Sequence, residues 1–164
     1  MTRLNMMENE LAAKFAKRFA GASMLLDRSE LAPAVQGLVK IRASQINGCG
    51  FCLDMHVKEA VAAGETPLRL ALVAAWRETT VFTEAERAAL ALTEDATRLA
   101  DTAGVPDDTW DAARKHFGDD ELAALVCLIA MINAANRMNV IVRQPGGAYE
   151  PGMFTEFVAE PSVR

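Results

Sequence analysis

Cys49, Cys52 and His56 bring two of the three cysteines and one of the two histidines of the chain into eight residues, CGFCLDMH. Residues three, four and seven apart share one face of an α-helix, so these side chains would point the same way. Cys49 is expected at or just before the helix start, where free backbone N–H groups and the helix dipole stabilise a thiolate. The cluster predicts a thiolate nucleophile, a second thiol that resolves the oxidised product, and a base one turn after Cys52.

Such a cluster serves one of three chemistries: a structural zinc site, a structural disulfide or a redox dithiol. A structural zinc normally takes four protein ligands, and this cluster offers three. Three cysteines and an N-terminus unlike a signal peptide favour a reducing, cytoplasmic setting, where a permanent disulfide is unusual. The βαβ pattern of a thioredoxin-like protein is missing, and chance rarely spaces inert cysteines in this way. The redox dithiol is therefore preferred, and we expect no metal and no cofactor.

The composition limits the classes of partner. The chain has 164 residues, a formal net charge of −5 and 51% hydrophobic residues, which is typical of one globular domain spanning residues 1–164. An acidic chain is a poor partner for nucleic acid or for an anionic membrane surface. The longest apolar stretch, residues 122–132, is shorter than the roughly 20 residues of a membrane-spanning helix. We expect neither nucleic acid nor membrane as partner.

Helical periodicity dominates the chain, and no stretch alternates like a half-buried strand. Thr83 and Glu86 form a capping box, Leu99 is expected to face inward, and Gly64 and Gly118 are expected to end helices. The predicted fold is an all-α bundle of about seven helices, in which the last and most apolar helix is central. The expected ranges are 8–19, 29–46, 49–64, 66–76, 83–100, 106–118 and 119–142.

The segment LVKIRASQINGCGFCLDMHVKEA, residues 38–60, resembles the core of the carboxymuconolactone decarboxylase/AhpD-like superfamily, in particular its alkylhydroperoxidase-like, peroxidase-related branch. The likeness continues through AWRETTVFTEAERAALALTEDATRLA and ELAALVCLIAMINAANRMNV. The resemblance implies an all-helical fold, assembly into homo-oligomers such as trimers or hexamers, and reduction of a hydroperoxide by the cysteine pair with a thiol or dithiol as reductant.

The resemblance also implies a role for each residue of the cluster. Cys52 corresponds to the peroxidatic cysteine, which becomes a sulfenic acid. Cys49 corresponds to the proton donor that then closes a disulfide with Cys52. His56 corresponds to the histidine of a proton relay.

One position departs from the family pattern. Members of the AhpD type carry a glutamate twelve residues before the first cysteine, which completes the relay, and here Gly37 occupies that position. Glu59, one turn after His56, and Glu94, on another predicted helix, are the candidate replacements. A solvated charge is the favoured interpretation of Glu59, because most charged residues on helices are exposed.

Four polar residues interrupt the most apolar helix, and they either line a substrate pocket or have a structural role. Buried polar groups more often satisfy the backbone and each other, so the structural role is favoured. These residues are Asn133, Asn136, Arg137 and Asn139. Cys127, in the apolar run of the same helix, is expected to be buried and inert. His116 is expected at the surface near a helix end.

Three functions compete. The leading one is a thiol-dependent peroxidase with an antioxidant role. The second is an enzyme like γ-carboxymuconolactone decarboxylase, which does not rely on a CxxC pair. The third is a non-catalytic, redox-responsive binding protein, which Gly37 in place of the relay glutamate keeps in contention.

Overall fold

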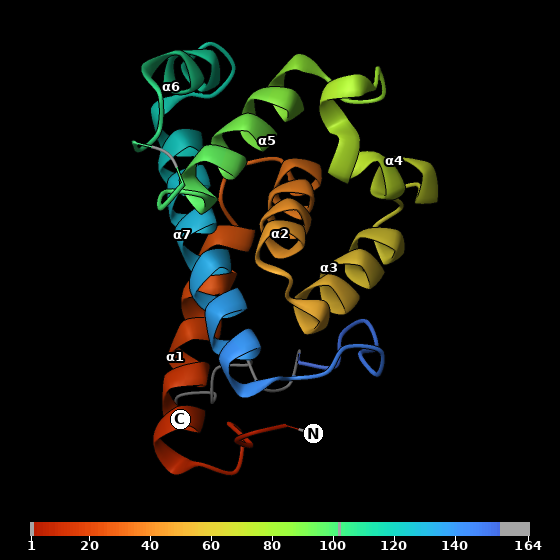
Figure 1. Cartoon of the computed structure of the whole chain (residues 1–164), viewed down its shortest axis with the longest axis vertical. Coiled ribbons are helices and arrows are strands. Elements are labelled where there is room, and N and C mark those ends of the chain that lie inside the picture. The colour runs from red at the N-terminus through yellow and green to blue at the C-terminus, as the bar shows by residue number, and fades with distance from the viewer. Residues whose placement is uncertain (1, 102, 155–164) are drawn as a thin grey trace, which may run out of the picture.

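The computed structural model describes residues 2–101 and 103–154, which contain seven α-helices, one 3₁₀-helix and no β-strand (Figure 1). This arrangement confirms the predicted all-α class. The elements are α1 (Glu10–Asp27), α2 (Pro33–Asn47), α3 (Gly50–Ala62), α4 (Pro67–Leu72), the 3₁₀-helix η1 (Val73–Glu78), α5 (Glu84–Thr97), α6 (Asp107–Arg114) and α7 (Asp119–Val142).

Capping side chains mark the starts of several helices. Asn9 accepts the N–H of Ala12 over 3.0 Å at the start of α1. The predicted capping box is present at the start of α5, where the Glu86 carboxylate accepts the N–H of Thr83 over 2.8 Å. Such caps satisfy the N–H groups that the first helical turn leaves free. Gly64, with φ +95°, follows the end of α3 as predicted.

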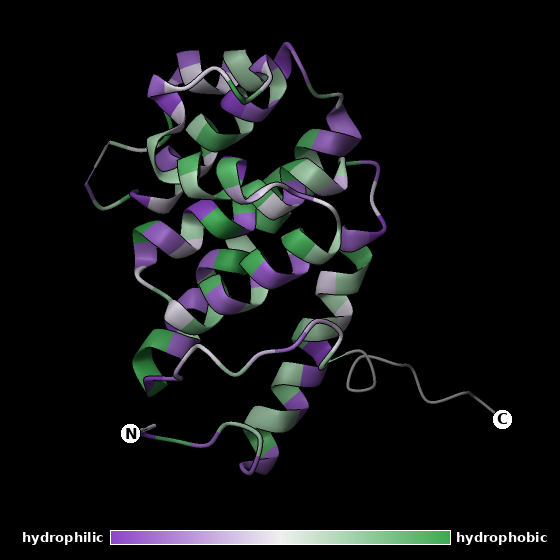
Figure 2. Cartoon of the chain, turned by 90° about the vertical axis from the view of Figure 1, so that its right-hand side faces the viewer, coloured by the Kyte–Doolittle hydropathy of each residue, from purple (hydrophilic) through white to green (hydrophobic). Residues whose placement is uncertain are grey.

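α2 is a central helix of the bundle, because it packs against α3, α5 and α7. Its buried residues divide between two hydrophobic clusters. Val35 and Val39 join α5, α6 and α7, while Leu38 and Ile41 join α4, η1 and α5. Hydrophobic residues recur along all the helices of the bundle (Figure 2). α7, which was expected to be central, packs against α1, α2, α3, α5 and α6, and its most extensive contact is the one with α2, so the two helices share the centre of the bundle.

By length and composition alone, the whole of α7 is apolar enough to cross a membrane. The expectation from the sequence concerned only its apolar stretch, residues 122–132, which is too short to do so. Its apolar residues serve the core, however: Leu125 and Leu128 are buried in the first cluster. Asn133 and Asn136 are buried as well and bond to neighbouring helices. α7 is thus a core helix of the bundle.

Several expectations at helix ends need correction. α1 continues to Asp27, beyond the expected end at residue 19. It lies beside α7, and its N-terminal part extends past the C-terminal end of α7 (Figure 1). Leu99 lies beyond the end of α5 and is 55% exposed. Gly118 does not end α6, which stops at Arg114, but caps the start of α7. Cys127 is exposed rather than buried, because the described helices leave its side of α7 uncovered.

Candidate active site

Cys49 and Cys52 form a disulfide at the start of α3, with Cα atoms 5.3 Å apart. Cys49 is the N-cap residue of α3, and its Sγ accepts the backbone N–H of Cys52 over 3.3 Å. Both cysteines are 1% exposed. The predicted position of Cys49 just before the helix start is therefore confirmed. Free N–H groups and the positive end of the helix dipole lie at the sulfurs, where they stabilise a thiolate.

The turn before the cysteines is fixed by a network of side-chain amides. Gly48 ends α2 in the left-handed region, with φ +66°, which brings Cys49 directly onto the start of α3. The Asn47 amide donates to the Oδ1 atoms of Asn133 and Asn136 on α7, over 3.0 and 2.9 Å. The Asn136 amide in turn donates to Ser44 Oγ over 3.0 Å. These contacts confirm the structural role expected for Asn133 and Asn136.

Asn139 differs from the other asparagines of α7 because it contacts the redox pair. Its side-chain amide donates a hydrogen bond to the Sγ of Cys52 over 3.5 Å. Arg137, by contrast, is exposed and donates to the Oδ1 of Asn133 over 3.1 Å. Of the four polar residues of α7, Asn139 is the one that can act directly on the chemistry of Cys52.

His56 lies one turn after Cys52 and is partly buried. Burial, and then the positive charge of Lys40 on α2, lower the pKa of the His56 imidazole from 6.5 to about 3. Lys40 itself forms an ion pair with Asp27 over 2.7 Å. His56 is thus neutral near pH 7, with one ring nitrogen that donates and one that accepts a hydrogen bond. A neutral imidazole can relay a proton, but it is a weak base.

A cavity of about 1120 Å³ borders His56, and most of its lining comes from α1, α2, α3, α7 and the segments before α1 and after α7. Its wall is mostly apolar and rich in flexible thioether side chains. Seven methionines line it: Met6, Met7, Met24, Met55, Met131, Met138 and Met153. Methionine side chains adapt to ligands of irregular shape. The cavity can therefore accept a large apolar molecule.

Gly37 lies in the wall of the same cavity as His56. A Cβ atom added at Gly37 would meet no other residue within 4 Å. The family's glutamate is therefore absent here without any close contact that demands a glycine. Lys40, one turn further along α2, lines the cavity and supplies a positive charge instead of a carboxylate.

Glu59 and its neighbours on α3 bind the segment that follows α7. The Asp54 carboxylate accepts the N–H groups of Gly147 and Tyr149 over 2.6 and 3.0 Å, and Lys58 donates to the carbonyl of Tyr149 over 2.7 Å. The Tyr149 hydroxyl donates to Glu59. Burial and this bond raise the pKa of Tyr149 to about 12. Glu59 is therefore partly buried and engaged, rather than simply solvated.

Gly146 marks the closest approach of this segment to the redox pair. A Cβ atom at Gly146 would lie 2.5 Å from the carbonyl oxygen of Gly50, the residue between Cys49 and Phe51. Only a glycine permits this contact, which brings the segment onto the first turn of α3.

Glu94 is held by a different set of charges. It is buried, it accepts the Trp76 indole N–H over 3.0 Å, and it pairs with Arg42 over 2.6 Å and with Arg77. Burial acts to raise the pKa of Glu94, but the bonds from Trp76 and Arg42 lower it overall. Glu94 does not line the cavity that borders His56. Its contacts give it a structural role.

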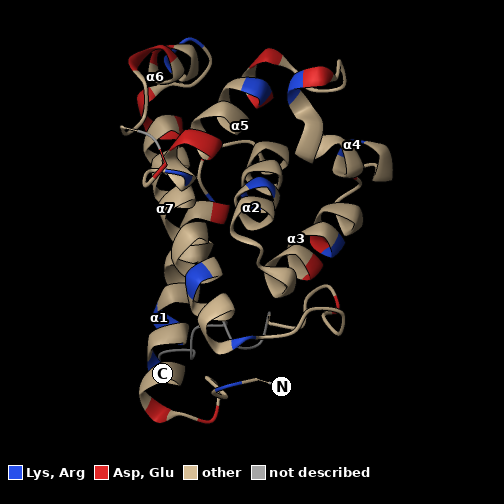
Figure 3. Ribbon diagram, in the orientation of Figure 1, with Lys and Arg blue, Asp and Glu red and all other residues tan. Residues whose placement is uncertain are grey.

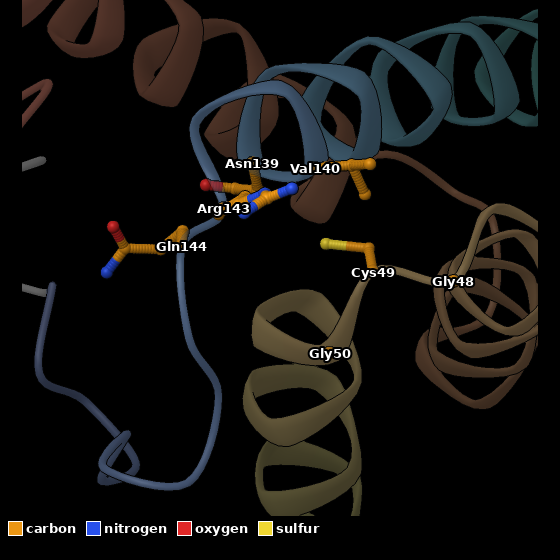
Figure 4. A pocket seen from close by; sticks show the side chains of 7 residues that line it. All are labelled: Gly48, Cys49, Gly50, Asn139, Val140, Arg143 and Gln144. Atoms are coloured by element: carbon orange, nitrogen blue, oxygen red, sulfur yellow. The ribbon is translucent and has the colours of Figure 1, made fainter. Parts of the chain in front are cut away.

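A second, smaller pocket of about 210 Å³ opens at Cys49 (Figure 4). Its walls are the glycines on either side of Cys49 and the last turn of α7. The lining residues are Gly48, Cys49, Gly50, Asn139, Val140, Arg143 and Gln144. Figure 4 shows the Cys49 side chain pointing toward the last turn of α7. Arg143 is the one charged residue of this pocket.

The sequence reasoning missed Lys40 and Tyr149. Lys40 lies three residues after Gly37, so helical spacing alone could have placed it on the same face of α2. Tyr149 is the one tyrosine of the chain and follows all the described helices, and no local pattern connects it with Glu59.

His116 is exposed, as predicted. Among the residues that the structure describes, no group of three or more His, Cys, Asp or Glu side chains could hold a metal ion.

The fold and the site define an all-helical protein with a vicinal cysteine pair capping a helix. The sequence pattern of the carboxymuconolactone decarboxylase family matches residues 10–95, which contain the whole CxxCxxxH cluster. The chain belongs to this family. This assignment confirms the resemblance found in the sequence.

Individual relatives agree with the assignment. The uncharacterized protein YdfG of Bacillus subtilis (strain 168) is 35% identical over 131 residues, which cover 80% of this chain and 88% of YdfG. A crystal structure from Agrobacterium tumefaciens, of a protein of unknown function suggested to be an antioxidant defence protein AhpD, is 36% identical and has a TM-score of 0.83 over 91% of this chain and all of that chain.

An uncharacterized peroxidase-related protein with an alkylhydroperoxidase AhpD core, from Ralstonia eutropha JMP134, has a TM-score of 0.72. The match covers 93% of this chain and 76% of that chain. At 18% identity this similarity concerns the fold alone.

Proposed function

We propose that this protein is a thiol-dependent peroxidase that reduces an organic hydroperoxide at Cys52. The observation that carries the proposal is the Cys49–Cys52 disulfide at the start of α3, with His56 one turn further on at the wall of a large apolar cavity. The family includes enzymes, and the similarity to a protein suggested to be an antioxidant defence protein AhpD supports this chemistry here.

The reaction needs two thiols and one hydroperoxide. The Cys52 thiolate attacks the outer oxygen of the hydroperoxide, the O–O bond breaks, and the alkoxide leaves with a proton as an alcohol. Cys52 is then a sulfenic acid. The Cys49 thiolate attacks its sulfur, hydroxide leaves with a proton as water, and the disulfide forms. Two electrons thus pass from the cysteine pair to the peroxide, and a dithiol reductant restores the pair.

Two groups assist Cys52 in this scheme. The Asn139 amide donates a hydrogen bond to its sulfur, which favours the thiolate over the thiol. The neutral His56 imidazole passes a proton between the cavity and the leaving oxygen. The apolar, methionine-lined wall favours a hydroperoxide with a large hydrocarbon part over hydrogen peroxide, because a small polar molecule gains nothing from apolar contacts.

The proposal includes a cytoplasmic location and assembly into a homo-oligomer, with a trimer or hexamer as the expected forms. Large apolar side chains left exposed on α1 and α7 support assembly, including Leu11 at 79% and Ile141 at 65% exposure. Apolar faces of this kind usually lie in interfaces. Light scattering at micromolar concentration should give a multiple of the 17.7 kDa chain mass, and the monomer mass would contradict assembly.

The experiment that tests the activity is steady-state reduction of cumene hydroperoxide with dithiothreitol as the reductant. We expect turnover by the native protein and none by Cys52→Ser. Cys49→Ser should form a sulfenic acid once, trapped by dimedone on Cys52, without turning over. Equal peroxide loss with the native protein and with both variants would refute the proposal.

A redox-responsive binding protein is the second candidate, and one observation favours it. Gly37 replaces the relay carboxylate, and burial together with the charge of Lys40 keeps His56 neutral, so the site lacks a strong base. In that case the cysteine pair would oxidise slowly, at the rate of an ordinary thiol, and oxidation would change the affinity of the cavity for an apolar ligand. The turnover experiment separates the two candidates.

A further inference from the structure

We propose that the small pocket at Cys49 is the site where the reducing thiol binds, and that this thiol attacks Cys49 rather than Cys52. The inference rests on the proposed function, since it concerns the half of the cycle that restores the dithiol. It adds a second binding site, separate from the apolar cavity that borders His56.

Access to the two sulfurs differs in the disulfide form. Cys49 lines the pocket of about 210 Å³ between the start of α3 and the last turn of α7. Cys52 lines neither this pocket nor the large cavity of the described chain. In the disulfide form a thiolate therefore reaches Cys49 through the pocket, whereas the hydroperoxide reacts with Cys52 only after the disulfide has opened.

The environment of the sulfurs favours the same direction of attack. Attack on Cys49 makes Cys52 the leaving thiolate, and a disulfide opens faster when the leaving thiolate is better stabilised. The Asn139 amide donates to Cys52 Sγ over 3.5 Å. The Cys49 Sγ instead caps α3, where it accepts the Cys52 N–H over 3.3 Å.

The balanced step is a pair of thiol–disulfide exchanges. The reductant thiolate forms a bond to Cys49 Sγ, the Cys49–Cys52 bond breaks, and its electron pair leaves with Cys52. The second thiol of the same reductant then attacks the reductant sulfur bound to Cys49 and releases Cys49 as a thiolate. The reductant leaves as a cyclic disulfide, having given two electrons to the cysteine pair and, with them, two protons.

The pocket also indicates which thiols fit. Because Cys49 is 1% exposed, a slender thiol can approach where the surface of a folded protein cannot. Arg143 is the one charged residue of the lining and is exposed, and it forms no ion pair with the described residues. Its guanidinium attracts an anion, so the pocket favours a slender dithiol that carries negative charge near its sulfur.

The test traps the first mixed disulfide of the full-length protein. The disulfide form, prepared with diamide and without peroxide, reacts briefly with 2-mercaptoethanesulfonate and is stopped with excess N-ethylmaleimide. Trypsin should release residues 43–58 with both cysteines, and fragment ions between them locate each adduct. When the fractions of the two adducts are extrapolated to zero time, we expect the sulfonate thiol on Cys49 and the maleimide on Cys52. The reverse distribution would overturn the proposal.

A pair of variants tests the part played by Arg143. The rate constants for 2-mercaptoethanesulfonate and for neutral 2-mercaptoethanol are each divided by the rate of the same thiol with a small free disulfide. The value for the sulfonate divided by the value for the neutral thiol should fall about twofold to fivefold in Arg143→Asn. Asparagine is chosen because it tolerates the left-handed conformation of this position. Arg114→Asn, at the exposed end of α6, is the matched control and should leave the ratio unchanged.

The outcomes separate this inference from the proposed function. Trapping on Cys49 in a protein that reduces no hydroperoxide would support the pocket and refute the peroxidase. Trapping on Cys52 in an active peroxidase would do the opposite. An unchanged ratio in Arg143→Asn would overturn the preference for anionic thiols.

Discussion

The Asn139 amide lies 3.5 Å from the Sγ of Cys52 and donates a hydrogen bond to it, which joins the last turns of α7 to the first turn of α3. In the reduced protein the same amide would face the Cys52 thiolate. A hydrogen bond to a charged group contributes about 1.5–3 kcal/mol. The contact therefore gives one asparagine of α7 a direct effect on the reactive sulfur.

Asn139→Ala should raise the pKa of the Cys52 thiol by about one unit, because about 1.4 kcal/mol corresponds to one pKa unit. The measurement is the rate of iodoacetamide alkylation against pH in a Cys49→Ser background. Gln144→Ala, in the same small pocket, is the control, since no hydrogen bond joins Gln144 to either sulfur. Overlapping pH profiles for the two variants would remove Asn139 from the chemistry.

Gly37→Glu should accelerate oxidation of Cys52 by cumene hydroperoxide. A positioned general base contributes about 10²–10⁴-fold, so an imperfectly aligned carboxylate should give at least about tenfold. A side chain can start at this position without a clash, because a Cβ at Gly37 meets no other residue within 4 Å. Gly37→Gln has the same size without the charge and should show no acceleration. Two variants of equal melting temperature and equal rate would show that proton transfer does not depend on this position.

His56 should make the native protein lose stability in acid. An unfolded chain protonates this imidazole below its ordinary pKa of 6.5, whereas the folded chain does so only near about 3. The contribution of His56 to stability is thus complete above pH 6.5 and is lost progressively as the pH falls toward 3.

His56→Gln should remove this dependence. Between pH 7 and pH 4.5 the free energy of unfolding of the native protein should fall by up to about 2.5 kcal/mol more than that of the variant. Urea unfolding at the two pH values measures the difference, and His116→Gln, at an exposed histidine, is the control. An equal loss in the native protein and in His56→Gln would mean that His56 is not held neutral.

Glu94→Gln should destabilise the fold by about 3 kcal/mol, because it leaves the guanidinium of Arg42 without its charged partner in a buried position. The pH profile of Cys52 alkylation should stay the same. Thermal melting and the alkylation assay together separate a structural Glu94 from a relay carboxylate. A changed profile with unchanged stability would return Glu94 to the proton path.

The sequence predicted the parts of this site that depend on local spacing. Cys49, Cys52 and His56 are spaced three and four apart, Cys49 lies at the start of α3 as expected, and the capping box marks the start of α5. Such features depend on a few neighbouring residues, so they can be read without knowing the fold.

The remaining parts depend on contacts between distant segments. Lys40 affects His56 from another helix, and Tyr149 contacts Glu59 from a segment 90 residues away. The exposure of Cys127 depends on which side of α7 the other described helices cover. The sequence does not show this side, because apolar residues both precede and follow Cys127. Acidic side chains gather on α6 and at the start of α7 (Figure 3), whereas the redox pair lies at the opposite end of α7.

The most direct test of the account is a single-turnover experiment with the fully reduced protein. Reduced protein is mixed with cumene hydroperoxide in a stopped-flow instrument, and free thiols are counted after each interval. We expect two thiols to disappear for each hydroperoxide, with a rate constant at least about 10²-fold above that of the same reaction with free dithiothreitol. Loss of thiols at the rate of the free dithiol, or loss that persists in Cys52→Ser, would contradict a peroxidase centred on Cys52.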